Sequence, residues 1–273
     1  MLTLGDARLT LLNGGNFRLD GGAMHGVVPK TLWSKLVSCD ALNRCEYTTH
    51  CLLVETGGKR VLIETGNGDK FSPKLKDIYG IDHDRAIGKA LGEVGLAPDD
   101  IDVVVMTHMH FDHTSGMSQF PGATFVITDA EWEAATGESR PLLHGYRPAH
   151  FDYAFDYRTI NYGERSVSSY ANFGRTFDLF GDGSVRLAST PGHSAGHQSV
   201  ICRLRDRDLV IAGDAIYTLA QLDDAPEPPR PEDRHNWQRS MRELRQFTRT
   251  YPQAVIIPGH DAEHWKTLDK RYE

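Results

Sequence analysis

The chain has 273 residues, of which 40% are hydrophobic and 25% charged, a composition typical of a globular protein with room for one large α/β domain. The 30 basic and 37 acidic residues give a net charge of −7 without a Lys/Arg cluster, so nucleic-acid binding is not expected. There is no apolar run of about 18 residues, so no membrane span is expected. The N-terminus lacks the basic and apolar segments of a secretory signal, which favours a cytoplasmic protein.

Apolar patterning predicts strands and helices along most of the chain. Strands are expected at residues 2–12, 50–55, 60–64, 101–106, 123–128, 184–190, 198–204, 208–212 and 254–257. Helices are expected at residues 85–95, 129–135 and 234–247. The second helix is expected to be capped by Asp129. Because residues 101–106 are almost all apolar, this strand is predicted to be buried on both faces.

Two segments without a regular pattern are candidates for shaping a binding site. Residues 13–35 are rich in glycine yet carry Phe17 and Met24, which fits either a surface loop or a loop that lines a pocket. Residues 137–172 carry many aromatic side chains among prolines and charges. A long segment of this kind is usually a lid, a binding loop or an oligomer contact, so a homodimer is one alternative. A solvent-exposed insertion fits less well because its aromatic residues would face water.

The four cysteines form no metal-binding or redox motif. Cys39, Cys45 and Cys51 are six residues apart and Cys202 is remote, so no C-x-x-C pair occurs. In a cytoplasmic chain we expect small buried thiols here, and a disulfide is not expected.

The greatest concentration of metal-binding side chains follows the strand at 101–106. Residues 107–113 read T-H-M-H-F-D-H, which places His108, His110, Asp112 and His113 within six residues. Imidazole and carboxylate are the ligands that zinc and similar divalent metals prefer, so this pattern indicates a metal site rather than a polar turn. Asp112 and His113 are adjacent and cannot both join the first pair at one small ion without strain. Two neighbouring ions therefore explain the spacing better than one.

Three later strands also end in a possible ligand beside a glycine. These residues are His193, Asp214 and His260. Each alone would be unremarkable, because a single histidine at a strand end is usually structural. Open sheets, however, place their sites at strand ends. The seven candidates together predict one metal site built from four strand ends.

These segments resemble the metallo-β-lactamase superfamily. The matching pieces are residues 108–113, 190–193, 213–214 and 258–260, which occur in the family's order and span nearly the whole chain. The resemblance implies a single α/β domain over residues 1–273, folded as an αββα sandwich of two facing sheets with helices outside. It implies one metal ion held by His108, His110 and His193, and a second held by Asp112, His113 and His260. Asp214 would bridge the two ions.

Within the superfamily, the chain is similar to the N-acyl homoserine lactonases, which are quorum-quenching enzymes. The similarity rests on residues 190–199 (TPGHSAGHQS) and on residues 213–217 (GDAIY), where a tyrosine stands three residues after the bridging aspartate. It implies a carboxylic-ester hydrolase that opens a lactone ring by attack of a hydroxide shared by two metal ions. Tyr217 would then donate a hydrogen bond to the oxyanion. Asp112 is a candidate for carrying the proton to the leaving alkoxide.

The metal, the substrate and the role of one further histidine stay open. Zinc suits the ligand set, but manganese, iron and cobalt also bind nitrogen and oxygen ligands. The nearest alternatives to a lactonase are other hydrolases on this scaffold: a thioesterase of the glyoxalase type, or a phosphoester or organophosphate hydrolase. A di-iron redox protein and a non-catalytic metal-binding protein are further alternatives. His197, four residues after His193, is expected to be structural or to orient a ligand rather than bind the metal itself.

Overall fold

Two β-sheets face each other in the computed structural model, which describes residues 7–26, 28–35, 37–81, 86–137, 139, 141–223 and 231–273. The first sheet contains, in spatial order, β13 (Arg271–Tyr272), β1 (Arg8–Asp20), β2 (Arg44–Thr56), β3 (Lys59–Ile63), β4 (Val103–Val105), β5 (Thr124–Thr128) and β6 (Tyr157–Ile160). The second contains β12 (Val255–Pro258), β11 (Asp208–Gly213), β10 (Gln198–Arg203), β9 (Val185–Ser189), β8 (Phe173–Asp178) and β7 (Ser168–Tyr170).

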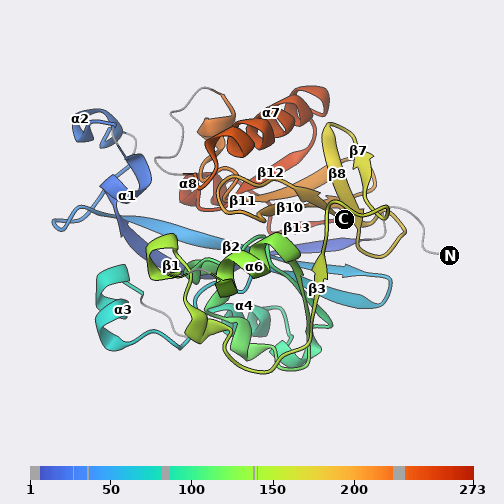
Figure 1. Cartoon of the computed structure of the whole chain (residues 1–273), viewed down its shortest axis with the longest axis horizontal. Coiled ribbons are helices and arrows are strands. Elements are labelled where there is room, and N and C mark those ends of the chain that lie inside the picture. The colour runs from blue at the N-terminus through green and yellow to red at the C-terminus, as the bar shows by residue number, and fades with distance from the viewer. Residues whose placement is uncertain are drawn as a thin grey trace.

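Helices cover the outer faces of both sheets. The longer helices are α3 (Pro73–Tyr79), α4 (Ala86–Glu93), α6 (Asp129–Gly137) and α7 (Arg234–Thr250). The short helices are α1 (Gly21–His25), α2 (Lys30–Trp33), α5 (Phe111–Thr114) and α8 (Ala262–Trp265). Single 3-10 turns form η1 (Pro98–Asp100), η2 (Met117–Gln119), η3 (Pro141–His144), η4 (Pro148–His150) and η5 (Leu219–Leu222). Figure 1 shows α7 on one side of the paired sheets and α4 and α6 on the other, which confirms the αββα sandwich.

Apolar side chains fill each space between the layers. Leu52 of the first sheet and Val200 of the second belong to the core between the sheets. The next residue of β2, Leu53, points the other way and packs with Ile87 of α4. A third cluster lies between the second sheet and α7. Because successive strand residues point to opposite faces, central strands in this fold are apolar on both faces.

The helix α7 has the amphipathic pattern that the sequence predicted. Asp233 caps it by accepting a hydrogen bond of 2.9 Å from a backbone N–H of the first turn. Trp237, Met241 and Leu244 recur at helical spacing and are buried against the second sheet. The helix continues past the predicted end at residue 247.

The segment 13–35 is not the loop that its glycine content predicted. β1 continues through residues 13–20, where Asn13 and residues 16–20 pair with β2 on either side of a bulge. The short helices α1 and α2 follow in the described part of this segment. Glycine disfavours a strand, but here the backbone pairing with β2 and the complete burial of Phe17 outweigh that cost.

The start of α6 differs from the prediction in one detail. Thr128, rather than Asp129, caps the first turn, because its Oγ1 accepts a hydrogen bond of 3.1 Å from the Glu131 N–H. The predicted first strand and first helix are found at β1 and α4, although residues 2–6 and Arg85 lie outside the described residues.

The cysteines also depart from expectation. Cys39 and Cys45 form a disulfide, with their Cα atoms 4.1 Å apart, so the expectation of thiols alone is wrong at this pair. A chain reversal at Asp40–Arg44 brings the two residues into an antiparallel bridge, and spacing alone did not reveal that reversal. Cys51 and Cys202 are buried free thiols, as expected.

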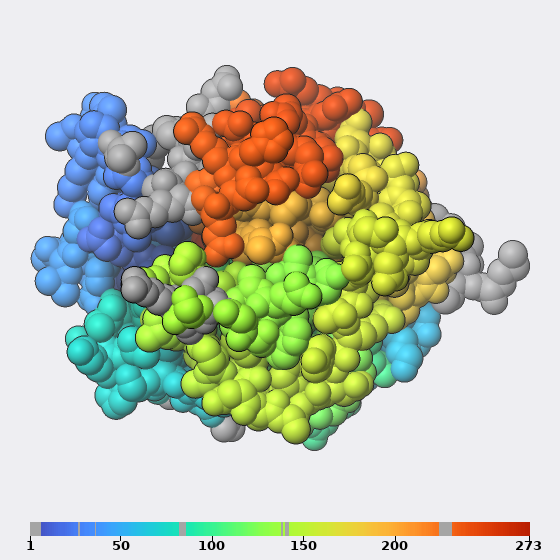
Figure 2. Space-filling model, in the orientation of Figure 1, coloured from blue at the N-terminus to red at the C-terminus, as the bar shows by residue number. Residues whose placement is uncertain are grey.

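The aromatic segment 137–172 has more regular structure than its sequence suggested. It contains η3, η4, β6 and β7, and β6 extends the first sheet in parallel with β5. Tyr146 and Phe151 are buried, and Tyr153 and Phe155 pack against the same apolar cluster. Figure 2 shows this segment, in yellow-green, lying along one face of the molecule. Most of its aromatic residues therefore pack on their own domain, which disfavours a solvent-exposed insertion.

Within the described ranges, no helix combines the length and the apolar content that crossing a bilayer requires.

Candidate metal centre

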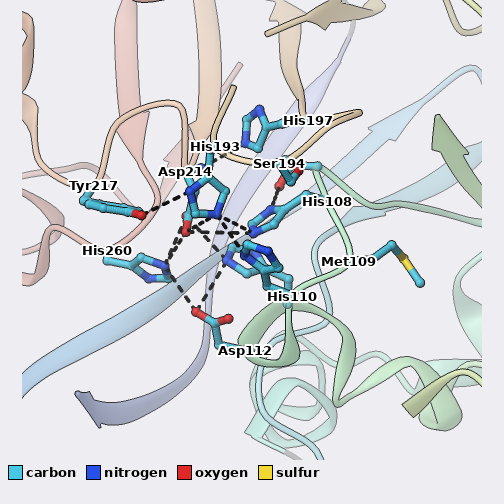
Figure 3. Close-up of polar contacts among 12 residues, drawn as sticks. His108, Met109, His110, Asp112, His193, Ser194, His197, Asp214, Tyr217 and His260 are labelled. Atoms are coloured by element: carbon cyan, nitrogen blue, oxygen red, sulfur yellow. Dashed lines mark hydrogen bonds and ion pairs between the residues drawn. The ribbon is translucent and has the colours of Figure 1, made fainter. Parts of the chain in front are cut away.

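The seven predicted ligands come together where four strands end. Residues 108–113 follow β4, His193 follows β9, Asp214 follows β11 and His260 follows β12. The strands β11 and β12 are parallel, so their carboxyl ends lie at the same edge of the second sheet. Figure 3 shows the side chains pointing toward one another from these separate segments. The sheet topology thus brings together residues that are far apart in the sequence.

Three histidines form the first group, here called cluster A: His108, His110 and His193. His193 Nε2 lies 3.1 Å from His108 Nε2 and 2.9 Å from His110 Nδ1. Tetrahedral zinc sites, with Zn–N bonds of about 2.0–2.1 Å, place their ligand nitrogens roughly 3.3 Å apart. Three neutral imidazoles directed at one point cannot all hydrogen-bond to one another, whereas a cation between them satisfies every lone pair. The donor set therefore fits a metal ion.

Two carboxylates and two histidines form the second group, cluster B: Asp112, His113, Asp214 and His260. His260 Nε2 lies 3.3 Å from Asp112 Oδ2 and 3.1 Å from Asp214 Oδ1. His113 Nε2 lies 3.4 Å from the same oxygen of Asp214. All four side chains are buried, and a mixed nitrogen and oxygen set of this kind suits a divalent cation.

Asp214 faces both clusters. Its Oδ1 lies 3.1 Å from His260 Nε2 of cluster B, and its Oδ2 lies 3.3 Å from His193 Nε2 of cluster A and 3.2 Å from His260 Nε2. The backbone holds it there, because the Asp214 N–H donates to His197 Nε2 over 3.0 Å. A carboxylate in this position has an oxygen available for an ion in each cluster.

Burial keeps the histidines of cluster A neutral. It lowers the pKa of His110 to about 4. It also holds the pKa of His108 and that of His193 well below the ordinary value. A neutral imidazole is the form that binds a metal, so cluster A is ready to bind without releasing protons.

The carboxylates give cluster B the opposite character. Burial opposes charge on His260, but Asp214 and Asp112 outweigh it and raise the pKa of His260 to about 10. At His113, burial also lowers the pKa, and the carboxylates of Glu64 and the two aspartates raise it by more. Protons therefore occupy cluster B in the metal-free protein, and a metal ion has to displace them.

Three of the clustered imidazoles hydrogen-bond through their outward ring nitrogen: His108 Nδ1 with Thr107 Oγ1 at 3.0 Å, His260 Nδ1 with the Thr48 carbonyl at 3.1 Å, and His193 Nδ1 with the Tyr217 hydroxyl at 3.1 Å. The outward His113 Nδ1 lies 3.0 Å from the Glu64 carboxylate, an ion-pair contact. Such partners fix the tautomer and the orientation of a ligand.

Glu64 is a residue of the site that the sequence interpretation did not single out. Besides His113, it accepts a hydrogen bond of 2.8 Å from the Thr107 N–H, so it connects the end of β3 to the first ligand loop. Its φ of 69° lies in the left-handed region that side chains rarely adopt. The available signal was an acidic residue that directly follows an apolar strand.

Glu131 is a second buried carboxylate that the sequence interpretation missed. It accepts hydrogen bonds from the Met109 N–H at 2.9 Å, the Ser194 hydroxyl at 2.6 Å and the Gly196 N–H at 3.0 Å. The helix α6 carries it, and nothing in the local sequence distinguishes it from the exposed Glu133.

His197 has the supporting role that the sequence predicted, and it belongs to neither cluster. Its Nδ1 contacts the Thr190 carbonyl at 3.1 Å, and its Nε2 accepts the Asp214 N–H. Burial lowers the pKa of His197 to about 3, so the ring is neutral and can accept that hydrogen bond.

Comparisons with known proteins agree with this geometry. Residues 46–260 match the Metallo-beta-lactamase superfamily. The N-acyl homoserine lactonase AttM of Rhizobium radiobacter is 28% identical over 233 residues, which are 81% of this chain and 84% of AttM. An N-acyl homoserine lactonase of Bacillus cereus is 27% identical over 79% of this chain and 82% of its own. A structure of a mutant AiiA of Bacillus thuringiensis, with N-decanoyl-L-homoserine at its active site, superposes with a TM-score of 0.74 at 22% identity, covering 98% of both chains.

The chain belongs to the metallo-β-lactamase superfamily, because the match spans most of its length, including the β4, β9, β11 and β12 strand ends that carry both clusters. Among its relatives it is similar to the N-acyl homoserine lactonases.

Proposed function

We propose that this protein is a metal-dependent hydrolase that opens the ring of N-acyl homoserine lactones or closely related lactones. The observation that carries the proposal is the position of Asp214 between a three-histidine cluster and a cluster of mixed ligands, with Tyr217 beside them. The similarity to lactonases from two bacterial genera over about four fifths of the chain supports the substrate class.

In this proposal the clusters would hold two divalent ions, zinc in the first place. His108, His110 and His193 would hold one ion, Asp112, His113 and His260 would hold the other, and Asp214 would be within reach of both. When bound, such a pair supplies a Lewis acid for the carbonyl and an activated water as the nucleophile. The buried setting excludes bulk water and strengthens each electrostatic interaction in the site.

Tyr217 is proposed to stabilise the oxyanion that forms when the carbonyl is attacked. If His193 uses Nε2 for the metal, its Nδ1 carries the ring proton, and this N–H donates a hydrogen bond to the Tyr217 oxygen at 3.1 Å. The hydroxyl proton of Tyr217 is then free to point to a substrate carbonyl oxygen. Burial and the nearby carboxylates keep the pKa of Tyr217 well above its ordinary value, so the phenol stays protonated as a donor.

Asp112 is proposed to move a proton as well as to bind metal. Its Oδ2 contacts His260 at 3.3 Å. Ring opening leaves an alkoxide on the homoserine side chain, and a carboxylate beside the nucleophile can take the proton of the attacking water and return it to that oxygen.

A buried apolar cluster lies beside cluster B, and in this proposal it supports the wall along which the acyl chain packs. It contains Phe17, Tyr47, Phe71 and Phe111, which belong to one buried cluster. The Phe17 ring meets the His260 ring edge-on, with ring centres 5.2 Å apart. The wall is built partly from the segment 13–35 that was expected to line a pocket.

The test is a hydrolysis panel monitored by proton release. The zinc-loaded protein is mixed with homoserine lactones of several acyl lengths, a simple γ-lactone, a thioester and a phosphotriester. Fast opening of the homoserine lactones, abolished by a chelator and restored by zinc, is the expected result. Turnover of the thioester or phosphotriester alone would replace the lactonase by one of the other hydrolases. No turnover at all, in protein shown to contain metal, would favour a non-catalytic role.

A further inference from the structure

Glu131 is buried and has no part in the proposed reaction, yet the hydrogen bonds that its carboxylate accepts from the described residues all come from the metal-ligand loops. It accepts a hydrogen bond from the N–H of Met109, which lies between His108 and His110 in the sequence. Of its other two donors, Ser194 directly follows His193 and Gly196 lies three residues after it. Glu131 thus connects the two loops that supply cluster A, and Figure 3 labels Met109 and Ser194 on them.

Both oxygens of the Glu131 side chain have to accept hydrogen bonds. Two of the three donors are backbone N–H groups, which cannot reverse their direction, and the third is the Ser194 hydroxyl. A glutamine in place of Glu131 has nearly the same shape but exposes an NH₂ group to one side. Whichever way the amide is turned, that group faces a backbone N–H, so the hydrogen bond to Met109 or the one to Gly196 is lost.

Cluster B has a different buried carboxylate. Glu64 contacts His113 Nδ1 at 3.0 Å and the Thr107 N–H at 2.8 Å. Among the hydrogen bonds of the described residues, Glu131 has none to a ligand of cluster B or to its neighbours in the chain. Glu64 therefore reaches a ligand of cluster B and the residue before His108, whereas the Glu131 carboxylate reaches only the loops of cluster A.

We propose that Glu131 is a positioning residue that sets the metal affinity of cluster A and leaves that of cluster B unchanged. It does so by holding the His108–His110 loop and the His193 loop at the separation that one ion requires. The inference rests on the ligand assignment of the proposed function. Partners that orient metal ligands typically change metal affinity by about 10–100-fold when they are removed.

The experiment measures zinc affinity, by competition with a chromophoric chelator, in two single-site backgrounds. His260→Ala leaves cluster A complete, and His110→Ala leaves cluster B complete. Glu131→Gln is expected to raise the zinc Kd roughly 10–100-fold in the first background and to change it by less than about twofold in the second. Glu133→Gln, an exposed change of the same kind in the same helix, is the matched control and should leave both values unchanged.

Equal weakening in both backgrounds would show a general loss of structure and would overturn the proposal, as would no change in either. If Glu131→Gln does not fold, Ser194→Ala decides, because it removes one donor of three. A smaller rise confined to cluster A supports the proposal, and an unchanged or evenly raised Kd contradicts it. A wild-type protein that binds no zinc would contradict the proposed function itself. That result can be told apart from failure of the Glu131 proposal, which requires a wild-type protein that binds zinc.

Discussion

At the scale of single residues, the candidate metal centre depends on the position of the Asp214 carboxylate. Asp214 faces both clusters, and the backbone of Gly259 passes directly against its Oδ1. A side chain at position 259 would occupy the space of that oxygen. Gly259 is therefore required by this close approach to Asp214.

Gly259→Ala is expected to displace the Asp214 carboxylate and to weaken zinc binding by roughly 10–100-fold, as other changes next to metal ligands do. Zinc content after dialysis against a weak chelator is the measurement. Gly92→Ala is the control, because a Cβ there has no neighbour within 4 Å. Equal zinc retention in the two variants would mean that Asp214 does not bind metal.

Tyr217→Phe is expected to lower kcat for lactone opening by roughly 10²–10³-fold, the usual effect of removing one oxyanion donor. KM should change much less, because the hydrogen bond strengthens as charge develops. Steady-state kinetics across one lactone series provides the comparison, with the exposed Tyr157→Phe as control. An unchanged kcat would leave Tyr217 as a support for His193 alone.

At the scale of elements, the long first strand links the outer part of the molecule to the site. β1 continues past its bulge as far as Asp20, and this extension carries Phe17 to the ring of His260. α1 and α2 follow it, and Trp33 of α2 packs in the same apolar cluster. One wall of the proposed substrate site thus depends on strand pairing at residues that look loop-like in the sequence.

Phe17→Leu is expected to raise KM for long-chain homoserine lactones by roughly 3–10-fold. This range corresponds to the loss of about 0.5–1.5 kcal/mol that aromatic contacts typically contribute. Short-chain lactones should be affected less, because they reach less of the wall. The ratio of kcat/KM between decanoyl and butanoyl substrates is the measurement. Phe180→Leu, at a residue 36% exposed, is the control. An unchanged ratio would mean that the acyl chain does not bind beside Phe17.

At the scale of the whole molecule, the metal centre joins the two sheets. Its ligands come from β4 of the first sheet and from β9, β11 and β12 of the second. In the metal-free protein, protons on the histidines of cluster B balance the buried aspartates. Stability of that form should therefore depend on pH in a way that metal binding removes.

The sign of this pH dependence follows from His260, whose pKa rises from 6.5 to about 10 on folding. Its contribution is fully present below pH 6.5 and is lost as the pH rises toward 10. We expect the unfolding midpoint of chelator-treated protein to fall over this range, measured by circular dichroism. Zinc-loaded protein should have a higher midpoint with a weaker slope, because the metal takes the place of the second proton on His260 and the ring stays neutral. Parallel curves for both forms would contradict this account.

The sequence by itself indicated the seven ligand candidates, because these depend on short-range patterns, and its resemblance to a known family implied the fold class. H-x-H-x-D-H after an apolar strand, and a ligand beside a glycine at later strand ends, are visible without coordinates. The grouping into two clusters came from spacing and family resemblance, and the structure brings the same residues together.

Only the tertiary structure decided the contacts between distant segments. Glu64 and Glu131 look like ordinary acidic residues in the sequence, and their burial beside ligand loops depends on how β3 and α6 pack. The Cys39–Cys45 disulfide and the strand at residues 13–20 likewise required backbone pairing that overrides local composition. Local sequence encodes which side chains can bind a metal, whereas burial and long-range pairing decide which neighbours hold them in place.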